Sequence, residues 1–320
     1  MAAFNAKGGG VMDYEAMLDA EVAAFIAKTA SCYPERVEPS TISQIREDYE
    51  AMCAQFAAPH PAGLQVADTV IEAHGLPPIS LRWYRPPDAS GRPALIYIHG
   101  GGFVMGGLES HDSICADLSV DAGLEVMAVD YRLAPEHPFP AALKDVAAAV
   151  EHFCATQPGR PFLLAGDSAG AWLAARMSHQ LRASQGRLLG QLLIYPTLGG
   201  DVDKGSYLVH AEAPMLTRGD ILWYSQHFWG TENPALQDGP LVQKDFSGLP
   251  PTVIFAASCD PLCDDGPAYA AKIKAAGGKA QCVMEDGLVH GYLRGRKEAS
   301  KIKDSFTRIV QAARALSKTD

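Results

Sequence analysis

The sequence predicts an α/β fold in which a largely parallel β-sheet is wrapped by helices. From about residue 60 onward, short strand-like runs take turns with helix-like segments, a pattern typical of parallel sheets. The 320 residues suffice for one large domain with an accessory piece or for two modest domains. Because 48% of the residues are hydrophobic and 20% are charged, we expect a folded protein with a substantial core.

The N-terminal part precedes this alternation. Residues 1–10 are small and glycine-rich, and we expect them to be disordered. From 14 to 30 and from 43 to 58, apolar residues return every three or four positions, which predicts two amphipathic helices. Prolines follow each of these segments.

Beyond residue 61 the pattern is typical of strands. DTVIEAH (68–74) and ISLRWYRP (79–86) alternate in polarity, whereas ALIYIHG (94–100) is almost wholly apolar, which predicts a sheet with mixed edges and a buried centre. Further strands are expected at 124–132, 161–167, 190–196, 251–258 and 280–286, and helices at 141–156, 169–184, 265–276 and 298–317. Residues 201–232 interrupt this rhythm with a helix-like, aromatic segment, which we interpret as an insertion between two strands.

Charge and hydropathy exclude several classes of partner. A formal net charge of −10 without any Lys/Arg tract argues against nucleic acid or an anionic membrane and favours a neutral or cationic small molecule. The apolar runs are too short to span a bilayer, and residues 1–20 lack the pattern of a signal peptide. We expect a cytoplasmic protein without stable membrane association. The sequence leaves open whether it forms a homodimer.

The seven cysteines are scattered and odd in number, which suits a reducing compartment better than a disulfide framework. Cys259 and Cys263 are four positions apart, but no second Cys/His pair lies at zinc spacing. We expect no metal site.

The stretch Gly166-Asp167-Ser168-Ala169-Gly170 lies between a predicted strand and a predicted helix, the context in which G-x-S-x-G indicates a nucleophilic serine. A tight turn there would hold the hydroxyl clear of the sheet, with glycines relieving the crowding. The helix would point its free N–H groups at the same apex. A serine before a helix is equally typical of an N-cap, so the pentapeptide alone leaves both interpretations open.

A nucleophilic serine needs a base and a group that orients the base. In the hydrolase order of serine, acid and histidine, the acid follows a late strand and the histidine follows the last one. Asp260 follows the strand at 251–258, and His290 follows the strand at 280–286. We therefore predict Ser168, Asp260 and His290 as the catalytic residues.

Four other carboxylates compete with Asp260. Asp264 and Asp265 lie where the next helix starts, and we expect them to cap it. Glu285 and Asp286 end a strand and lie too close in sequence to His290.

The run ALIYIHGGGF places glycines directly after a strand. Backbone N–H groups of Gly101 and Gly102, joined by that of Ala169, are predicted to bind the negative oxygen of a tetrahedral intermediate. A flexible loop or a phosphate cradle are the alternatives, but no phosphate-binding motif can be laid on these residues. We expect His99 to brace the loop.

Together these motifs resemble those of bacterial esterases of the hormone-sensitive-lipase family, in the branch with GDSAG at the nucleophile. The family's HGGGF matches His99 to Phe103, and its YRLAPEHPFPAA matches Tyr131 to Ala142. Its DPL matches Asp260 to Leu262, and its HGF is similar to His290 to Tyr292. The resemblance covers the chain from about residue 64. It implies an α/β-hydrolase fold with an eight-stranded sheet and hydrolysis of carboxylic esters, often with short acyl chains.

In that family a helical cap covers the active site. The resemblance implies that residues 11–60 and the insertion 201–232 form this cap on a catalytic domain of residues 61–320. Such helices would exclude water and shape the pocket, although the same apolar stripe is what any helix needs to dock.

The substrate pocket is the least determined part of the site. We predict Phe103, Leu216 and Leu262 as pocket walls, with ordinary core packing as the alternative. The chain departs from the family pattern at Trp172, where Asn is common, and at Ala171, which replaces a glycine, so the packing behind the nucleophile helix is expected to differ. The tyrosine of HGY adds a phenol near the catalytic loop. We expect the proline-rich motif at 131–140 to fix a turn.

The predicted activity is that of a serine carboxylesterase acting on a small-molecule ester with a short- to medium-chain acyl group. His290 would take the proton of Ser168 as the hydroxyl attacks the carbonyl, and Asp260 would fix the imidazole tautomer. An acyl-enzyme follows, and no cofactor is needed. Amide hydrolysis and acyl transfer would use the same triad. A non-catalytic ligand receptor on the same fold is a further alternative, against which the presence of His290 argues.

Overall fold

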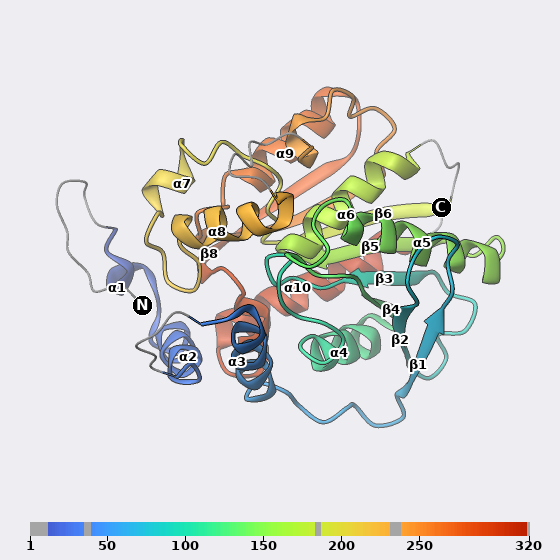
Figure 1. The fold of residues 1–320 in the computed structure, drawn as a ribbon, viewed down its shortest axis with the longest axis horizontal. Helices are drawn as coiled ribbons and strands as arrows, with labels where there is room; N and C mark the ends of the chain where they lie inside the picture. The colour runs from blue at the N-terminus through green and yellow to red at the C-terminus, as the bar shows by residue number, and fades with distance from the viewer. Residues whose placement is uncertain (1–11, 35–39, 183–186, 231–237, 319–320) are drawn as a thin grey trace.

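The computed structural model describes residues 12–34, 40–182, 187–230 and 238–318, so the expected disorder of residues 1–10 lies outside the described residues. One sheet lies at the centre with helices on both faces (Figure 1). Within the described ranges, every helix is too short or too polar to span a bilayer.

The sheet contains β1 (Gln65–Ile71), β2 (Ile79–Arg85), β3 (Ala94–Ile98), β4 (Glu125–Asp130), β5 (Phe162–Asp167), β6 (Leu188–Ile194), β7 (Thr252–Cys259) and β8 (Ala280–Val289). Their spatial order is β1-β2-β4-β3-β5-β6-β7-β8. Strand β2 runs antiparallel to both of its neighbours, and the other pairs are parallel. The mostly parallel eight-stranded sheet of the α/β-hydrolase fold is confirmed.

The helices within the described residues fall into three groups. Three precede the sheet, namely α1 (Tyr14–Met17), α2 (Ala20–Ser31) and α3 (Ile42–Ala54). Five belong to the strand-and-helix alternation, namely α4 (Asp112–Ala122), α5 (Ala141–Thr156), α6 (Ala169–Leu181), α9 (Asp265–Ala275) and α10 (Ser300–Leu316). The insertion after β6 carries α7 (Ser206–Val209) and α8 (Arg218–Trp229), and two 3-10 helices are η1 (Pro240–Val242) and η2 (Tyr292–Lys297).

A separate apolar core fills each face of the sheet. The pleat of β3 turns Ala94, Ile96 and Ile98 toward a core that includes residues of α5, α6 and α9. Leu95 and Tyr97 point the other way, into a core that includes residues of α2, α3, α4 and α10. A central strand buried on both faces explains why its sequence is continuously apolar.

One helix prediction was inaccurate and one helix was missed, each for a local reason. The single helix expected at 14–30 is interrupted, because the Asp19 side chain accepts a hydrogen bond from the Val22 N–H and starts a new helix there. Helix α4 was not predicted. Its buried face carries Asp117, paired with Arg296, and Ser119, bonded to backbone carbonyls, and these polar residues obscure the apolar periodicity.

The N-terminal helices and the insertion lie at the same end of the molecule, in blue and in yellow to orange in Figure 1. The Tyr14 hydroxyl, in α1, lies 2.9 Å from Nδ1 of His210 beside α7. Arg46, in α3, donates to the carbonyl of Val104, in the loop after β3. Both segments therefore reach the end of the sheet at which the parallel strands finish.

Candidate active site

Ser168 is the single residue between the end of β5 and the start of α6, and its backbone has φ 52° and ψ −119°. A positive φ is unusual for a residue with a side chain and indicates strain that the surrounding structure must hold. The side chain makes no N-cap hydrogen bond to α6. Its Oγ instead lies 2.8 Å from Nε2 of His290. Of the two interpretations that the pentapeptide left open, the geometry favours the nucleophile.

The glycines on either side make this turn possible. A Cβ on Gly166 would lie 2.6 Å from the carbonyl oxygen of Ile98, and one on Gly170 would lie 2.0 Å from the same atom. Because these are backbone contacts in a packed region, no side-chain movement could relieve them. The end of β3 can thus approach the nucleophile turn only where both residues are glycine.

His290 and Asp260 complete a chain of hydrogen bonds. His290 directly follows β8, and its Nδ1 lies 2.7 Å from Oδ2 of Asp260. Asp260 directly follows β7, is 1% exposed, and accepts a second hydrogen bond from the Leu262 N–H through Oδ1. The structure therefore brings together all three residues that the sequence placed at separate strand ends.

The competing carboxylates have other partners. Glu285 is paired with Arg308 of α10. Asp264 occupies the N-cap position of α9 and Asp265 lies in its first turn, as predicted, but the Asp264 side chain makes no capping hydrogen bond. Asp264 accepts a hydrogen bond from the Ser206 N–H, while the buried Asp265 accepts from the Leu198 N–H and the Tyr207 hydroxyl. These two carboxylates therefore attach the insertion to the body, because the backbone donors of that irregular segment need buried acceptors.

Sequence reasoning missed the role of Asp167, the residue before the nucleophile. The Tyr97 hydroxyl and the Gly100 N–H donate to its Oδ1 at 2.8 and 3.0 Å. Nε2 of His111 lies 3.3 Å from Oδ1 and 3.4 Å from Oδ2. Burial alone would raise the pKa of Asp167, but His111 and the hydrogen bonds hold it well below its usual range. Asp167 is thus a buried anion that links the nucleophile turn to the loop after β3, residues 100–103, which we call the glycine loop.

The glycine loop has an unusual backbone. Gly101, Gly102 and Phe103 have φ values of 119°, 62° and 64°. Among the hydrogen bonds of the described residues, none uses the N–H of Gly101 or Gly102 as a donor. The N–H of Ala169 is the first of α6 and has no partner within the helix. The three predicted donors are therefore free to bind an oxygen atom.

His99 lies behind this loop. Its Nδ1 lies 2.7 Å from the Gly100 carbonyl oxygen, and its ring stacks on Tyr131 with centroids 4.2 Å apart. Burial, and then the neighbouring His111, lower the pKa of His99 to about 3, so the imidazole is neutral near pH 7. These contacts agree with the bracing role expected from the sequence.

The three predicted pocket walls have different surroundings. Leu216 and Leu262 pack with Tyr207 and Ile221 in a small cluster beside the Asp260 loop. Phe103 is instead stacked on Phe228 of α8, with centroids 3.7 Å apart. The contact seen for Phe103 is core packing, which holds α8 against the body.

Two of the departures from the family pattern, at Trp172 and at Tyr292, are explained by their contacts. Trp172 packs edge-on against Phe103, Phe139 and Phe228, so it fills the space between α6 and the insertion. The hydroxyl of Tyr292 accepts a hydrogen bond from Ser305, so this phenol faces α10.

The motif from Tyr131 to Ala142 holds the glycine loop in place. The Tyr131 hydroxyl donates to the carbonyl of His99, and the Ala134 N–H donates to the carbonyl of Phe103. The peptide bonds before Pro135 and Pro140 are cis. The structural role expected for this motif agrees with these contacts.

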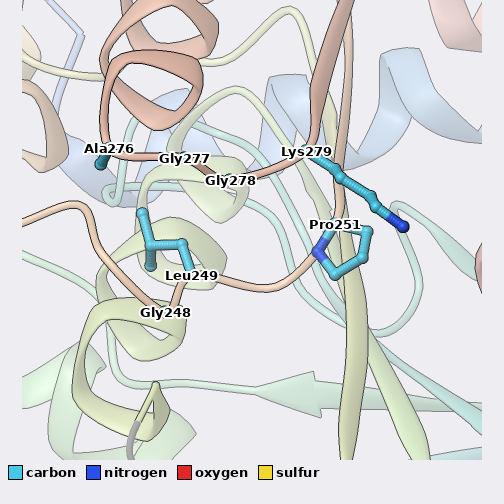
Figure 2. A pocket seen from close by; sticks show the side chains of 7 residues that line it. All are labelled: Gly248, Leu249, Pro251, Ala276, Gly277, Gly278 and Lys279. Carbon is cyan, nitrogen blue, oxygen red and sulfur yellow. The ribbon is translucent and has the colours of Figure 1, made fainter.

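The pocket drawn in Figure 2 lies elsewhere. It is lined by residues such as Leu249 and Lys279, just before β7 and β8 begin. Ser168, Asp260 and His290 follow the carboxyl ends of their strands, at the opposite edge of the sheet. In the part of the chain that the structure describes, no group of three or more His, Cys, Asp or Glu side chains is arranged to hold a metal ion.

Comparisons with known proteins agree with this geometry. A family model described as "alpha/beta hydrolase fold" matches residues 95–294. Esterase LipI of Mycobacterium tuberculosis is 39% identical over 248 residues, which cover 73% of this chain and 76% of the relative. Carboxylesterase NlhH of the same species is 38% identical over 243 residues, covering 72% of this chain and 76% of the relative. An ethyl acetate hydrolase of Pseudomonas putida is 34% identical over 257 residues, covering 76% of this chain and 80% of the relative.

The solved structures give the same result for the fold. A hyperthermophilic esterase from the archaeon Pyrobaculum calidifontis superposes with a TM-score of 0.85 at 30% identity, covering 94% of this chain and 99% of that one.

Proposed function

This chain belongs to the α/β-hydrolase family, among the esterases of hormone-sensitive-lipase type, and on that premise we propose that it hydrolyses short- to medium-chain carboxylic esters through Ser168, His290 and Asp260. The observation that carries the proposal is the single imidazole of His290, with Nε2 2.8 Å from Ser168 Oγ and Nδ1 2.7 Å from Asp260 Oδ2.

In the first half-reaction Ser168 is acylated. Oγ attacks the ester carbonyl carbon as its proton passes to Nε2 of His290, and Asp260 stabilises the imidazolium through Nδ1. The carbonyl oxygen becomes negative and is bound by the N–H groups of Gly101, Gly102 and Ala169. In other enzymes, one donor of this kind typically lowers the activation free energy by about 3 to 4 kcal/mol. When the bond to the alcohol oxygen breaks, Nε2 returns the proton to that oxygen.

In the second half-reaction water takes the place of the alcohol. His290 accepts a proton from the water as its oxygen attacks the acyl carbon, and the tetrahedral intermediate uses the same N–H groups. The bond to Oγ then breaks, Oγ regains the proton, and the carboxylic acid leaves. Atoms and charges balance with ester and water as the reactants.

We further propose that α1, α2 and α3 act with α7 and α8 as the cap of this site. In support, the Tyr14 to His210 contact joins the two segments, and Arg46 of α3 bonds to the loop that carries Gly101 and Gly102. A cap would limit the access of water and shape the space for the substrate.

Hydrolysis of p-nitrophenyl butyrate tests the proposal. Ser168→Ala is expected to lower kcat by several orders of magnitude, and Asp260→Asn by about 10⁴-fold, as in other triads where the wrong tautomer results. Ser178→Ala is the matched control, because this buried serine of the same helix donates its hydroxyl hydrogen bond to the Ala174 carbonyl, one turn away. Activity retained in Ser168→Ala would refute the proposal.

A further inference from the structure

The segment that directly follows His290 is anchored to three different helices. This segment, residues 291–297, consists of a glycine and η2, and we call it the histidine turn. Tyr292 bonds to α10, and Arg296 bonds to α4. Arg294 bonds instead to α3, one of the helices that precede the sheet. The N-terminal helices therefore hold one of the three anchors of the turn that carries the proposed catalytic base.

The guanidinium of Arg294 lies between α3 and the start of the histidine turn. Its Nε donates to Sγ of Cys53 at 3.1 Å, and its Nη2 donates to the hydroxyl of Tyr49. The guanidinium carbon lies 4.9 Å from the centroid of the Tyr49 ring, which adds a cation–π contact. A Cβ built on Gly291 would lie 3.8 Å from Nη1. One side chain thus reaches both α3 and the backbone next to His290.

Arg294 is a buried cation whose hydrogen-bond partners are neutral. It is 7% exposed, and burial raises the pKa values of both the Tyr49 phenol and the Cys53 thiol. Arg296 is paired with Asp117, whereas among the described residues no carboxylate forms an ion pair with Arg294. A charge buried in this way lowers the stability of the fold. Its position beside the proposed catalytic base therefore points to a role in the reaction.

Helix α3 also holds the glycine loop. Arg46 of α3 donates through Nε to the Val104 carbonyl at 2.7 Å and through Nη2 to the Ala134 carbonyl at 2.9 Å. The Ala134 N–H in turn donates to the carbonyl of Phe103. Through Arg46 and Arg294, the same helix is thus joined to both halves of the proposed site, the loop with the oxyanion donors and the turn with the base.

We propose that Arg294 is a positioning residue that holds the histidine turn against α3, so that the imidazole of His290 stays aligned with Ser168 only while α3 is docked. The inference rests on the proposed function and extends it, because α3 then aligns the reacting groups as well as limiting the access of water. A displacement of about 1 Å in a reacting group can lower the rate about 10²-fold. A change that acts only on the transition state lowers kcat and leaves KM nearly unchanged.

The kinetics of p-nitrophenyl butyrate hydrolysis test the inference. Arg294→Met removes the tether and is expected to lower kcat by about 10- to 100-fold, with KM within about twofold of the wild type. Tyr49→Phe removes one acceptor, keeps the ring, and is expected to lower kcat by about threefold to tenfold. The double variant is expected to be no slower than Arg294→Met alone, because both changes break the same contact. A wild-type kcat in Arg294→Met would overturn the inference.

Arg296→Met is the matched control for a loosened histidine turn. Arg296 is 3% exposed, and its partners Asp117 and Ser113 lie in α4. Because this variant breaks a buried ion pair, its melting temperature is expected to fall at least as far as that of Arg294→Met. Its kcat should nevertheless stay within about twofold of the wild type at temperatures where circular dichroism shows a folded protein. Equal losses of kcat in the two variants would overturn the inference.

Arg294→Lys separates the tether from the charge. Burial would raise the pKa of Asp167, and after His111 the charge of Arg294 is among the influences that lower it. A lysine keeps this charge but lacks the planar fork that bonds Cys53 and Tyr49 together, so kcat is expected to stay well below that of the wild type. Full recovery of kcat in Arg294→Lys would overturn the inference. If Arg294→Met does not fold, Arg294→Lys and Tyr49→Phe give the same comparison with smaller expected losses.

Failure of the inference is distinguishable from failure of the proposed function. If the wild type hydrolyses the ester and Ser168→Ala does not, while Arg294→Met keeps the wild-type kcat, only the inference falls. If the wild type does not hydrolyse the ester, the proposed function falls and the inference falls with it.

Discussion

Replacement of Asp167 tests the buried link between the nucleophile turn and the glycine loop. In Asp167→Ala, the Tyr97 hydroxyl and the Gly100 N–H both lose their acceptor in a site that is 3% exposed. Each unsatisfied buried donor costs about 1 to 3 kcal/mol, so the unfolding free energy is expected to fall by about 2 to 6 kcal/mol. Asp167→Asn keeps Oδ1 as an acceptor and is expected to cost less than about 2 kcal/mol.

Urea unfolding followed by the fluorescence of the four tryptophans measures these differences. The pH dependence supplies a second readout. The pKa of Asp167 is held below its usual range, so its stabilising contribution is complete above about pH 4 and is lost as the pH falls through the lowered pKa. The advantage of the wild type over Asp167→Asn should therefore shrink below about pH 4. An Asp167→Ala protein within about 0.5 kcal/mol of the wild type at pH 7 would refute the reasoning.

Three further changes have expected outcomes. Gly170→Ala places a Cβ 2.0 Å from the Ile98 carbonyl oxygen and should lower the melting temperature by several degrees or abolish folding. In the control Gly219→Ala, the nearest neighbour of the new Cβ is 3.5 Å away, so this variant should be as stable as the wild type or more stable. Equal melting temperatures of the two variants would contradict this reasoning. Trp172→Ala removes a ring buried among other rings and should cost about 3 to 5 kcal/mol in urea unfolding, and a cost under about 1 kcal/mol would show that the cluster is not tightly packed. Burial raises the pKa of Asp265 to about 7, so this group lowers the stability of the protein progressively as the pH rises from about 4 to 7. In Asp265→Asn, the plot of melting temperature against pH should lack this decrease. Parallel plots for the wild type and the variant would contradict the reasoning.

Much of the fold and the positions of the reacting residues could be predicted from the sequence. Parallel strands end at the same edge of a sheet, so residues that directly follow β5, β7 and β8 were expected to meet, as Ser168, Asp260 and His290 do. That inference needed only strand ends and chain order, both of which are local features of the sequence.

Long-range polar partners could not be predicted in the same way. The donors to Asp167 come from Tyr97 and Gly100, far away in the chain, and no local pattern indicates them. Asp264 and Asp265 lie where caps are expected, yet the unsatisfied backbone of the insertion offered them better partners. In each case tertiary hydrogen bonding outweighed a local preference.

The position at which the insertion docks could not be predicted from the sequence either. Apolar periodicity indicated that α8 is helical but not that Tyr224 would lie on Gly102, because that contact depends on how Phe228 and Ile221 dock. A signal was nevertheless present in Trp172, whose departure from the family pattern marked altered packing behind the nucleophile helix.

Labelling with a fluorophosphonate, followed by mass mapping, tests the central claim most directly, since this electrophile reacts preferentially with an activated serine hydroxyl. One adduct on Ser168 is expected in the wild type, and the rate of labelling should fall by at least about 10³-fold in His290→Ala, because the base that takes the Oγ proton is gone. An adduct on a different residue, or labelling of Ser168 at an undiminished rate without the imidazole, would contradict the account.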